Sequence, residues 1–137
     1  MDLLFPDQGL VYQLSQILTG GVKYRLFTNN IVPGLSTTLA GLVEAAWAGY
    51  APISQSWSNF TTNGVSGHNG FGIAAPINFA NTSGVNQSAY GYYVTDPAGS
   101  PTMILAIALF DSAPVVVPNG GQITVVPTWG DFSQLSS

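Results

Sequence analysis

His68 is the only histidine in the chain and the first residue to consider for acid–base chemistry. It lies in the segment 58–70, which is rich in glycine, asparagine and serine and has no acidic residue within twenty positions of the histidine. Nucleophilic catalysis needs a histidine that is hydrogen-bonded to a serine and oriented by a carboxylate. Serines occur throughout the chain, and no G-x-S-x-G motif is present. The pattern therefore predicts an exposed loop histidine and not a catalytic one.

The acidic residues are spread singly, which does not favour paired-carboxylate or metal chemistry. Four of the aspartates adjoin Pro, Gly or Ser, where a carboxylate usually accepts hydrogen bonds in a turn. There is no D-x-D-x-D run for calcium and no cysteine for zinc or a thiol nucleophile. We therefore expect no metal, no cofactor and no enzymatic activity; a calcium site of scattered loop oxygens and a converging glycosidase pair are the open alternatives. The six acids are Asp2, Asp7, Glu44, Asp96, Asp111 and Asp131.

A glycine-rich stretch, Ser66 to Gly72, comes close to the spacing of a nucleotide-binding loop. It does not match G-x-G-x-x-G, and neither a strand–helix context nor a basic residue accompanies it. We interpret it as a flexible loop.

Aromatic residues are the remaining candidates, because their rings could stack on a sugar or a base. No basic groove accompanies them, which argues against nucleic acid. Trp and Tyr are common in cores and at subunit interfaces, and we expect those positions here. The candidates are Trp47, Tyr50, Trp57, Phe60, Tyr90, Tyr92, Tyr93 and Trp129.

Charge is scarce in this chain. The two basic residues, Lys23 and Arg25, and the six acids make up 6% of the 137 residues, whereas 46% are hydrophobic. A soluble monomer normally carries charge on about a quarter of its residues. The net charge of −4 disfavours capture of nucleic acid or anionic lipid. The composition therefore predicts a surface that is largely covered by neighbouring molecules.

The N-terminal region predicts an arm followed by a short amphipathic helix. The first residues are acidic where a secretory signal needs basic ones, so we expect synthesis in a cytoplasm without export. Over residues 8–19, four apolar side chains recur at helical spacing, and Gly20-Gly21 would end the helix. That stripe consists of Leu10, Leu14, Ile17 and Leu18.

The rest of the chain predicts short strands separated by turns. The most apolar run, Met103 to Phe110, is far shorter than the about 20 residues of a membrane span and is expected to be a buried strand. Tyr90, Tyr92 and Val94 alternate with Gly91, Tyr93 and Thr95, which is typical of a half-buried antiparallel strand. Strands are expected at 23–28, 44–50 (with Trp47 buried), 53–57, 71–80, 88–95, 102–110 and 121–128, a short helix at 37–43, and a loop at 58–70.

Turn residues at 81–84, 96–99 and 118–121 fit hairpins, and Pro114, Pro118 and Pro127 favour strand edges or bulges. The fold class that follows is mainly β: an antiparallel, jelly-roll-like β-sandwich with a short N-terminal helix and one helical turn near 37–43. The predicted organisation is an arm and helix over 1–22, a β-sandwich domain over 23–129 and a C-terminal tail over 130–137.

Several segments resemble a family of small virion proteins of tailed bacteriophages. They are Leu3-Leu-Phe-Pro-Asp-Gln-Gly9, Tyr24-Arg-Leu-Phe-Thr-Asn-Asn-Ile-Val-Pro33, Thr37-Thr-Leu-Ala-Gly-Leu-Val-Glu-Ala-Ala-Trp-Ala-Gly-Tyr-Ala51, Tyr90-Gly-Tyr-Tyr-Val-Thr-Asp96, Ala108-Leu-Phe110 and Val117-Pro-Asn-Gly-Gly-Gln-Ile-Thr-Val125. The matching residues are structural and include no catalytic signature. The resemblance implies a place in the virion after synthesis in the host cytoplasm.

From the resemblance and the composition we expect a capsid decoration (cement) protein that binds the outer face of the assembled head and stabilises it. Its partners would be the major capsid protein and copies of itself, with a trimer favoured, and neither nucleic acid nor membrane. A tail, connector or baseplate component is the alternative within the virion, with a tail protein as partner. A carbohydrate-binding module that stacks sugars on Trp57, Tyr90 or Tyr92 is the alternative from another class.

We expect the arm, the helix and the tail to make the protein–protein contacts; the alternative is that these side chains pack within their own chain. The predicted interface residues are Leu3, Leu4, Phe5, Leu10, Leu14, Leu18, Trp129, Phe132 and Leu135.

Overall fold

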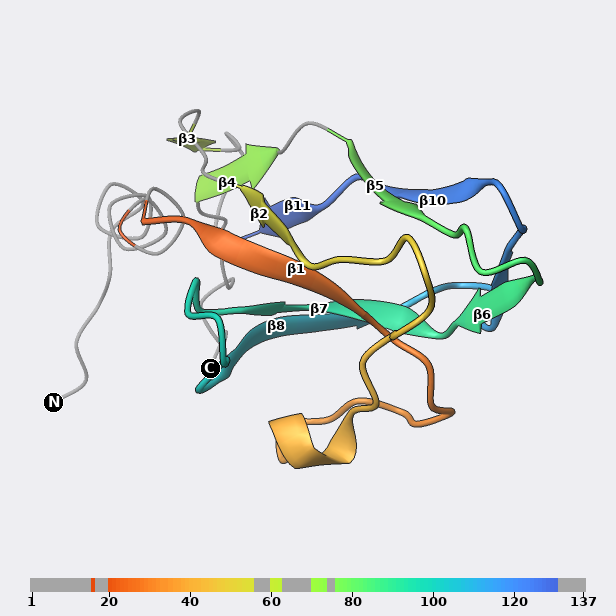
Figure 1. The fold of residues 1–137 in the computed structure, drawn as a ribbon. Coiled ribbons are helices and arrows are strands. Elements are labelled where there is room, and N and C mark those ends of the chain that lie inside the picture. The colour runs from red at the N-terminus through yellow and green to blue at the C-terminus, as the bar shows by residue number, and fades with distance from the viewer. Residues whose placement is uncertain (1–15, 17–19, 56–59, 63–69, 74–75, 131–137) are drawn as a thin grey trace, which may run out of the picture. The chain divides into compact units, whose positions relative to one another are not determined.

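Short antiparallel strands dominate the structure, a computed structural model that describes residues 16, 20–55, 60–62, 70–73 and 76–130 (Figure 1). Contacts divide the chain into two units. The larger contains Val22–Gln55 and Ile77–Val125, and the smaller contains Met1–Gly21, Ser56–Pro76 and Val126–Ser137. No helix within the described ranges is long and apolar enough to cross a membrane.

A four-stranded antiparallel sheet is the centre of the larger unit, with the order β2-β1-β7-β8. β1 (Val22–Phe27) and β7 (Gly91–Thr95) are the inner strands, and β2 (Ile53–Gln55) and β8 (Ile104–Leu109) are the edges. The predicted strand at 23–28 is confirmed by β1. The expectation that only one face of the 88–95 strand is buried is wrong, because Tyr93, Val94 and Thr95 are all buried.

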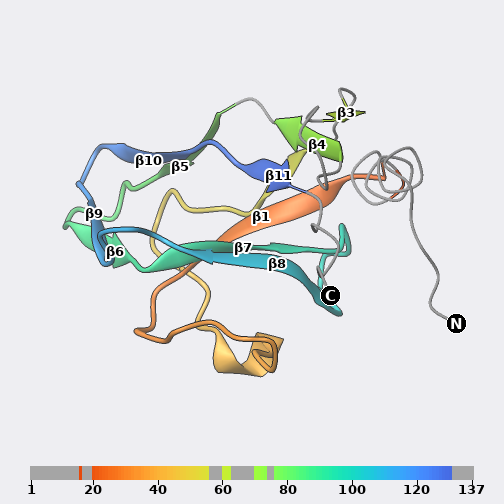
Figure 2. The same cartoon turned by 180° about the vertical axis from the view of Figure 1, so that it is seen from behind.

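Both faces of this inner pair are covered, which explains the burial. Figures 1 and 2 show β5 (Ile77–Ala80) and β10 (Gln122–Val125) as a second layer on one side of the sheet, and the segment with the 3-10 helix η1 (Leu39–Gly41) on the other. Burial alternates along β5 and β10, so each presents one apolar face to the interior. The prediction of a mainly β, antiparallel, sandwich-like fold is confirmed.

The strands of the second half of this unit form one antiparallel ribbon that changes sheet twice. β7 pairs with β8, β6 (Gln87–Ala89) with β9 (Val115–Val117), and β5 with β10. The turn at 96–99 joins β7 to β8 and is the predicted hairpin. The turns at 81–84 and 118–121 are not hairpins, because each connects strands of different sheets.

One change of sheet occurs at Tyr90, where the predicted strand 88–95 divides into β6 and β7. The Tyr90 amide donates to the Phe27 carbonyl at 2.9 Å, and its own carbonyl accepts from the Phe110 amide at 2.9 Å. The two backbone groups of this residue therefore bond to different neighbouring strands. A pattern of alternating side chains does not reveal such a break, because both groups remain satisfied.

Asn81 lies at the second change of sheet, where it connects the turns at 81–84 and 118–121. It is fully buried. Its Nδ2 donates to the carbonyls of Val85 and Val117, both at 2.9 Å, and its Oδ1 accepts from the Ser83 amide at 2.9 Å and hydroxyl at 2.7 Å. Its backbone amide donates to Gly121 at 2.9 Å. All polar atoms of this side chain are thus bonded, as burial requires.

Proline divides two further strands that were predicted as continuous. The 71–80 prediction becomes β4 (Gly70–Ile73) and β5, with Pro76 before β5, and the 121–128 prediction becomes β10 and β11 (Thr128–Gly130), with Pro127 between them. Proline has no amide hydrogen for a ladder. Pro114 and Pro118 flank β9, so Pro114, Pro118 and Pro127 lie between strands and not at the edge positions or bulges that were predicted.

The smaller unit contains a three-stranded antiparallel sheet with the order β11-β4-β3. Because β3 (Phe60–Thr62) and the first residue of β4 fall within 58–70, the prediction that this whole segment lacks regular structure is wrong. The predicted helix over 8–19 and loop residues 63–69 lie outside the described residues, apart from Gln16, which is helical. The proposed boundaries at residues 22 and 130 stay predictions.

The segment 44–50 is a turn and not the predicted strand. Only Glu44 makes a bridge, to Phe27, and Trp47 is half-buried. Gly49 has a φ of +91°, and a Cβ atom there would lie 2.8 Å from Thr82 Oγ1. A residue in the left-handed backbone conformation cannot continue an extended strand. The predicted helical turn near 37–43 is confirmed by η1.

We predict that Gly91→Ala destabilises the larger unit by about 2–3 kcal/mol. A Cβ at this buried position would strike the Ala108 carbonyl oxygen and lie 2.7 Å from the Phe27 ring, and neither can withdraw without breaking a strand pair. Urea unfolding followed by tryptophan fluorescence measures the change. Gly99→Ala is the matched control, because a Cβ there meets nothing within 4 Å. Equal stability of both variants would show that the contact is not limiting.

Candidate interaction surface

The chain's only arginine, Arg25, is buried in the middle of β1 and forms an ion pair with Glu44. Its Nη1 lies 3.0 Å from Glu44 Oε1 and 3.1 Å from Oε2, and its Nε donates to Thr95 Oγ1 at 3.1 Å. The Arg25 Nη2 atom is buried and has no hydrogen-bond partner among the described residues. Sequence reasoning missed this pair; the signal was an arginine between Tyr24 and Leu26 in a predicted strand, because a buried arginine usually has a partner.

Tyr50 links the Arg25–Glu44 pair to the backbone of β1. Its hydroxyl donates to Glu44 Oε1 at 2.8 Å and accepts from the Leu26 amide at 3.2 Å, while its ring stacks on Phe79 at 5.8 Å between centroids. Burial and the bond to Glu44 raise the pKa of Tyr50 well above its usual range. Burial, followed by the negative charge of Glu44, raises the pKa of Tyr93 to about 12.

These groups hold the fold together and do not resemble a catalytic centre. Each phenol stays protonated at neutral pH, and the carboxylate is occupied by the guanidinium and a hydroxyl. A general base needs a free lone pair within reach of a substrate proton. In the ranges that the structure describes, no three His, Cys, Asp or Glu side chains gather as metal ligands.

The two aspartates of the larger unit, Asp96 and Asp111, lie in turns. Asp96 accepts hydrogen bonds from the amides of Thr102 at 2.8 Å and Met103 at 3.1 Å, and the bond from Thr102 is the main reason that its pKa is lowered. This confirms the predicted turn acceptor. Asp111 is exposed in the turn after β8. The remaining acids, Asp2, Asp7 and Asp131, and His68 lie outside the described residues.

The aromatic side chains whose burial is described are buried or half-buried, and none of them is exposed. The Tyr92 ring lies 6.4 Å from that of Tyr24 and 6.2 Å from that of Phe110 between centroids, and burial raises the pKa of Tyr92. Tyr90 packs against the cluster of Phe27, Leu42 and Tyr93. Tyr90 and Tyr92 are therefore occupied by other rings and apolar side chains. The side chains of Trp57, Phe60 and Trp129 are outside the described residues.

The predicted interface residues of the arm, helix and tail also fall outside the described residues. They stay predictions: Leu3, Leu4, Phe5, Leu10, Leu14, Leu18, Trp129, Phe132 and Leu135.

Large apolar side chains outnumber charged ones on the described surface. Apart from the Arg25–Glu44 pair, the described charges are Lys23, Asp96 and Asp111. Single exposed apolar residues are ordinary, but a surface with so little charge to separate them is not. The large apolar side chains exposed in the described part are Val32, Leu35, Val43, Val85, Met103, Leu109, Val116 and Val126.

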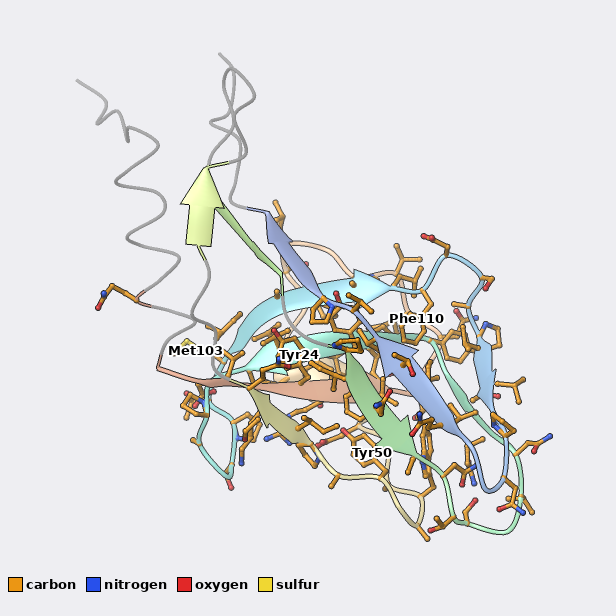
Figure 3. The ribbon with its side chains drawn as sticks, turned by 90° about the horizontal axis from the view of Figure 1, so that it is seen from above. Tyr24, Tyr50, Met103 and Phe110 are labelled. Carbon is orange, nitrogen blue, oxygen red and sulfur yellow. The ribbon has the colours of Figure 1, made fainter. Side chains whose placement is uncertain are left out.

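β8 is an apolar strand that is only partly buried. Of its six residues, five are half-buried and Leu109 is exposed, so the prediction of a buried strand for Met103 to Phe110 is correct for the strand and wrong for its burial. The reason is its place in the sheet: among the described strands, β7 alone pairs with it. Met103 and Phe110 mark the two ends of this strand in Figure 3. We call the outward side of residues 103–109 the β8 edge.

A hollow of about 380 Å³ lies beside the beginning of the β8 edge. It is formed by η1 with the residues before it and by the residues that lead into β8. Asp96 positions the latter through its bonds to Thr102 and Met103. The lining residues are Thr37, Thr38, Leu39, Ala40, Thr102, Met103 and Ile104.

Comparisons of the chain with protein-family models, with curated proteins and with solved structures found no match.

We predict that Glu44→Gln destabilises the protein by about 3 kcal/mol, because it leaves a buried guanidinium without its counter-charge. This is the low end for a buried pair, since the Glu44 side chain is 31% exposed. Urea unfolding at neutral pH gives the value. Asp111→Asn changes the charge equally at an exposed site and should alter stability by less than about 0.5 kcal/mol. Comparable losses in both variants would point to net charge and not to the pair.

We also predict a loss of stability at alkaline pH. The pKa values of Tyr50 and Tyr93 are raised by folding, so their contribution is complete below the unfolded value of about 10 and declines as pH rises toward 12. Each phenol steepens this decline by up to about 1.4 kcal/mol per pH unit. Urea midpoints between pH 9 and 12 should fall less steeply in Tyr93→Phe. An identical pH profile in that variant would contradict the assignment.

Proposed function

We propose that this protein is a structural component of a tailed-phage virion, and specifically a decoration protein that binds the outer face of the assembled head. The observation that carries the proposal is the charge distribution. In the described part of the larger unit, the only ion pair is used internally, and three isolated charges accompany a larger number of exposed apolar side chains. The resemblance of several segments to small virion proteins supports the location.

An uncharged, apolar-bearing surface suits an obligate contact. Burying an unpaired charge costs several kcal/mol, whereas a surface of Val, Leu, Ser and Thr forms contacts without that cost. The protein would stabilise the head by mass action, because a ligand that binds only the assembled lattice shifts assembly toward it by RT ln(1 + [L]/Kd) per site.

Leu35 is the side chain in the larger unit on which we place a contact with the head. It lies in the segment between β1 and η1 with a relative exposure of 111%, and Val32 in the same segment is 86% exposed. Both apolar side chains are therefore largely exposed to solvent.

We predict that the purified protein binds heads that lack it, saturably, and raises the temperature at which they release DNA. Leu35→Asp should weaken binding roughly tenfold, about 1.4 kcal/mol, by placing a charge in the contact. Val85→Asp is the matched control, since Val85 is 59% exposed in the turn after β5. Bound copies are counted by quantitative mass spectrometry.

Three results would redirect the proposal. Copies in threes or sixes per particle, with no binding to heads, would identify a tail, connector or baseplate component. Saturable binding on a glycan array would favour the carbohydrate-binding alternative. Absence from purified particles would remove the virion assignment altogether.

A further inference from the structure

The turn at 118–121 contains an Asn-Gly pair with a chemistry of its own. Asn119 and Gly120 are both exposed. Asparagine before glycine is the pair most prone to deamidation, because glycine has no side chain to hinder attack by its own backbone nitrogen. In this reaction the Gly120 nitrogen loses its proton and bonds to Asn119 Cγ, the Cγ–Nδ2 bond breaks, and ammonia leaves. Water then opens the cyclic imide to aspartate or isoaspartate.

The shape of the turn requires this glycine and holds the asparagine away from the reactive geometry. The Gly121 amide donates to the Pro118 carbonyl at 2.9 Å, and Gly120 has a φ of +75°. Both are features of a type II turn, whose third residue needs a positive φ and is usually glycine. The ψ angle of the second residue, here Asn119, is about +120° in such a turn. Closing the imide ring requires this angle to rotate to negative values.

Hydrogen bonds also restrain both reacting groups. The Gly120 amide donates to the Asn81 carbonyl at 2.8 Å, so the nitrogen that would attack keeps its proton. Asn119 Oδ1 accepts from the Gly84 amide at 2.9 Å, which fixes the carbon that would be attacked. The Asn119 amide donates to Asn86 Oδ1 at 3.0 Å. The reaction therefore needs these bonds to break and the turn to change its conformation.

We propose that Asn119 is a deamidation site whose reaction is controlled by the opening of the asparagine corner, which consists of residues 81–86 and 118–121. Asn81 is fully buried and anchors the corner, so the closed form protects the amide. Isoaspartate adds a methylene group to the backbone, and Gly120 can then no longer reach Asn81 with the turn intact. An opening that leads to reaction is therefore irreversible. This site is independent of the proposed function and of head binding.

Comparison of the folded and the denatured protein tests the control by the corner. Purified protein is incubated in mildly alkaline buffer with and without guanidinium chloride, and chymotryptic peptides are followed by mass spectrometry, because deamidation changes their mass. Asn119 should convert at least about tenfold more slowly in the folded protein, since only the open fraction reacts. In denaturant its rate should be comparable to those of Asn63 and Asn69, which also precede glycine and serve as internal standards.

Asn86→Ala weakens the corner without changing the core. Asn86 is exposed, and its Oδ1 is the acceptor for the Asn119 amide. The variant should stay folded and raise the conversion of Asn119 and the hydrogen exchange of the Gly120 amide roughly fivefold, as the loss of one ordinary hydrogen bond would. Asn78→Ala is the matched control, because Asn78 is exposed and accepts from Thr124 Oγ1 at 2.6 Å but lies outside the corner. It should leave both rates unchanged.

Equal conversion of Asn119 in the folded and the denatured protein would overturn the control by the corner. A Gly120 amide that exchanges as fast as in an unfolded chain, or an Asn86→Ala variant that behaves like Asn78→Ala, would overturn it as well. If Asn119 stays unchanged in denaturant while the two internal standards convert, the modification site itself is wrong.

Discussion

The buried Arg25–Glu44 ion pair is the constraint on which the larger unit depends. A guanidinium in the middle of an inner strand is costly to desolvate, and it is tolerated only where a carboxylate and further acceptors meet it. Glu44 comes from the segment that covers one face of the sheet, Thr95 from the neighbouring strand, and Tyr50 links the carboxylate to the β1 backbone. Arg25 therefore ties the Glu44 segment and β7 to β1, and Tyr50 adds a second link between Glu44 and β1. Removing one partner of such a pair is strongly destabilising, because the other charge is left buried and uncompensated.

The ion pair also positions the segment that covers one face of the sheet. Backbone bonds from Thr28 to Val43 at 2.8 Å and from Ala45 to Leu26 at 3.0 Å hold its ends beside β1. Leu42 is thereby brought onto Phe27 and Tyr93, and Leu39 of η1 packs beside them. This apolar cluster closes one face of the sheet, while Tyr50 stacked on Phe79 belongs to the other side. The ion pair and these backbone bonds together define the register of the segment on β1.

The folded ribbon explains why an apolar strand remains at an edge. β8 enters the sheet through its hairpin with β7, and the ribbon then turns away at Tyr90 and again at Asn81 into the second layer. β1 occupies the other side of β7, so β8 has one neighbour in the larger unit. An uncharged edge is a liability in a free monomer and an asset in a protein that works by packing against copies or partners.

Local sequence determined the strand content, the turns and the absence of recognisable catalytic patterns. Alternation of side chains and the Gly, Pro and Asn turn residues act over a few positions, so they predicted β1, β2, β8, η1 and the turn at 96–99 correctly. Tertiary structure alone decided the remaining features. Glu44 forms its ion pair with Arg25 across 19 positions of sequence. The predicted strand 88–95 breaks at Tyr90 because the Tyr90 amide and carbonyl bond to different strands. β8 is half-buried because it lies at the edge of the sheet. These depend on which distant strands pair, and pairing is set by burial and register over the whole chain and not by the preferences of neighbouring residues.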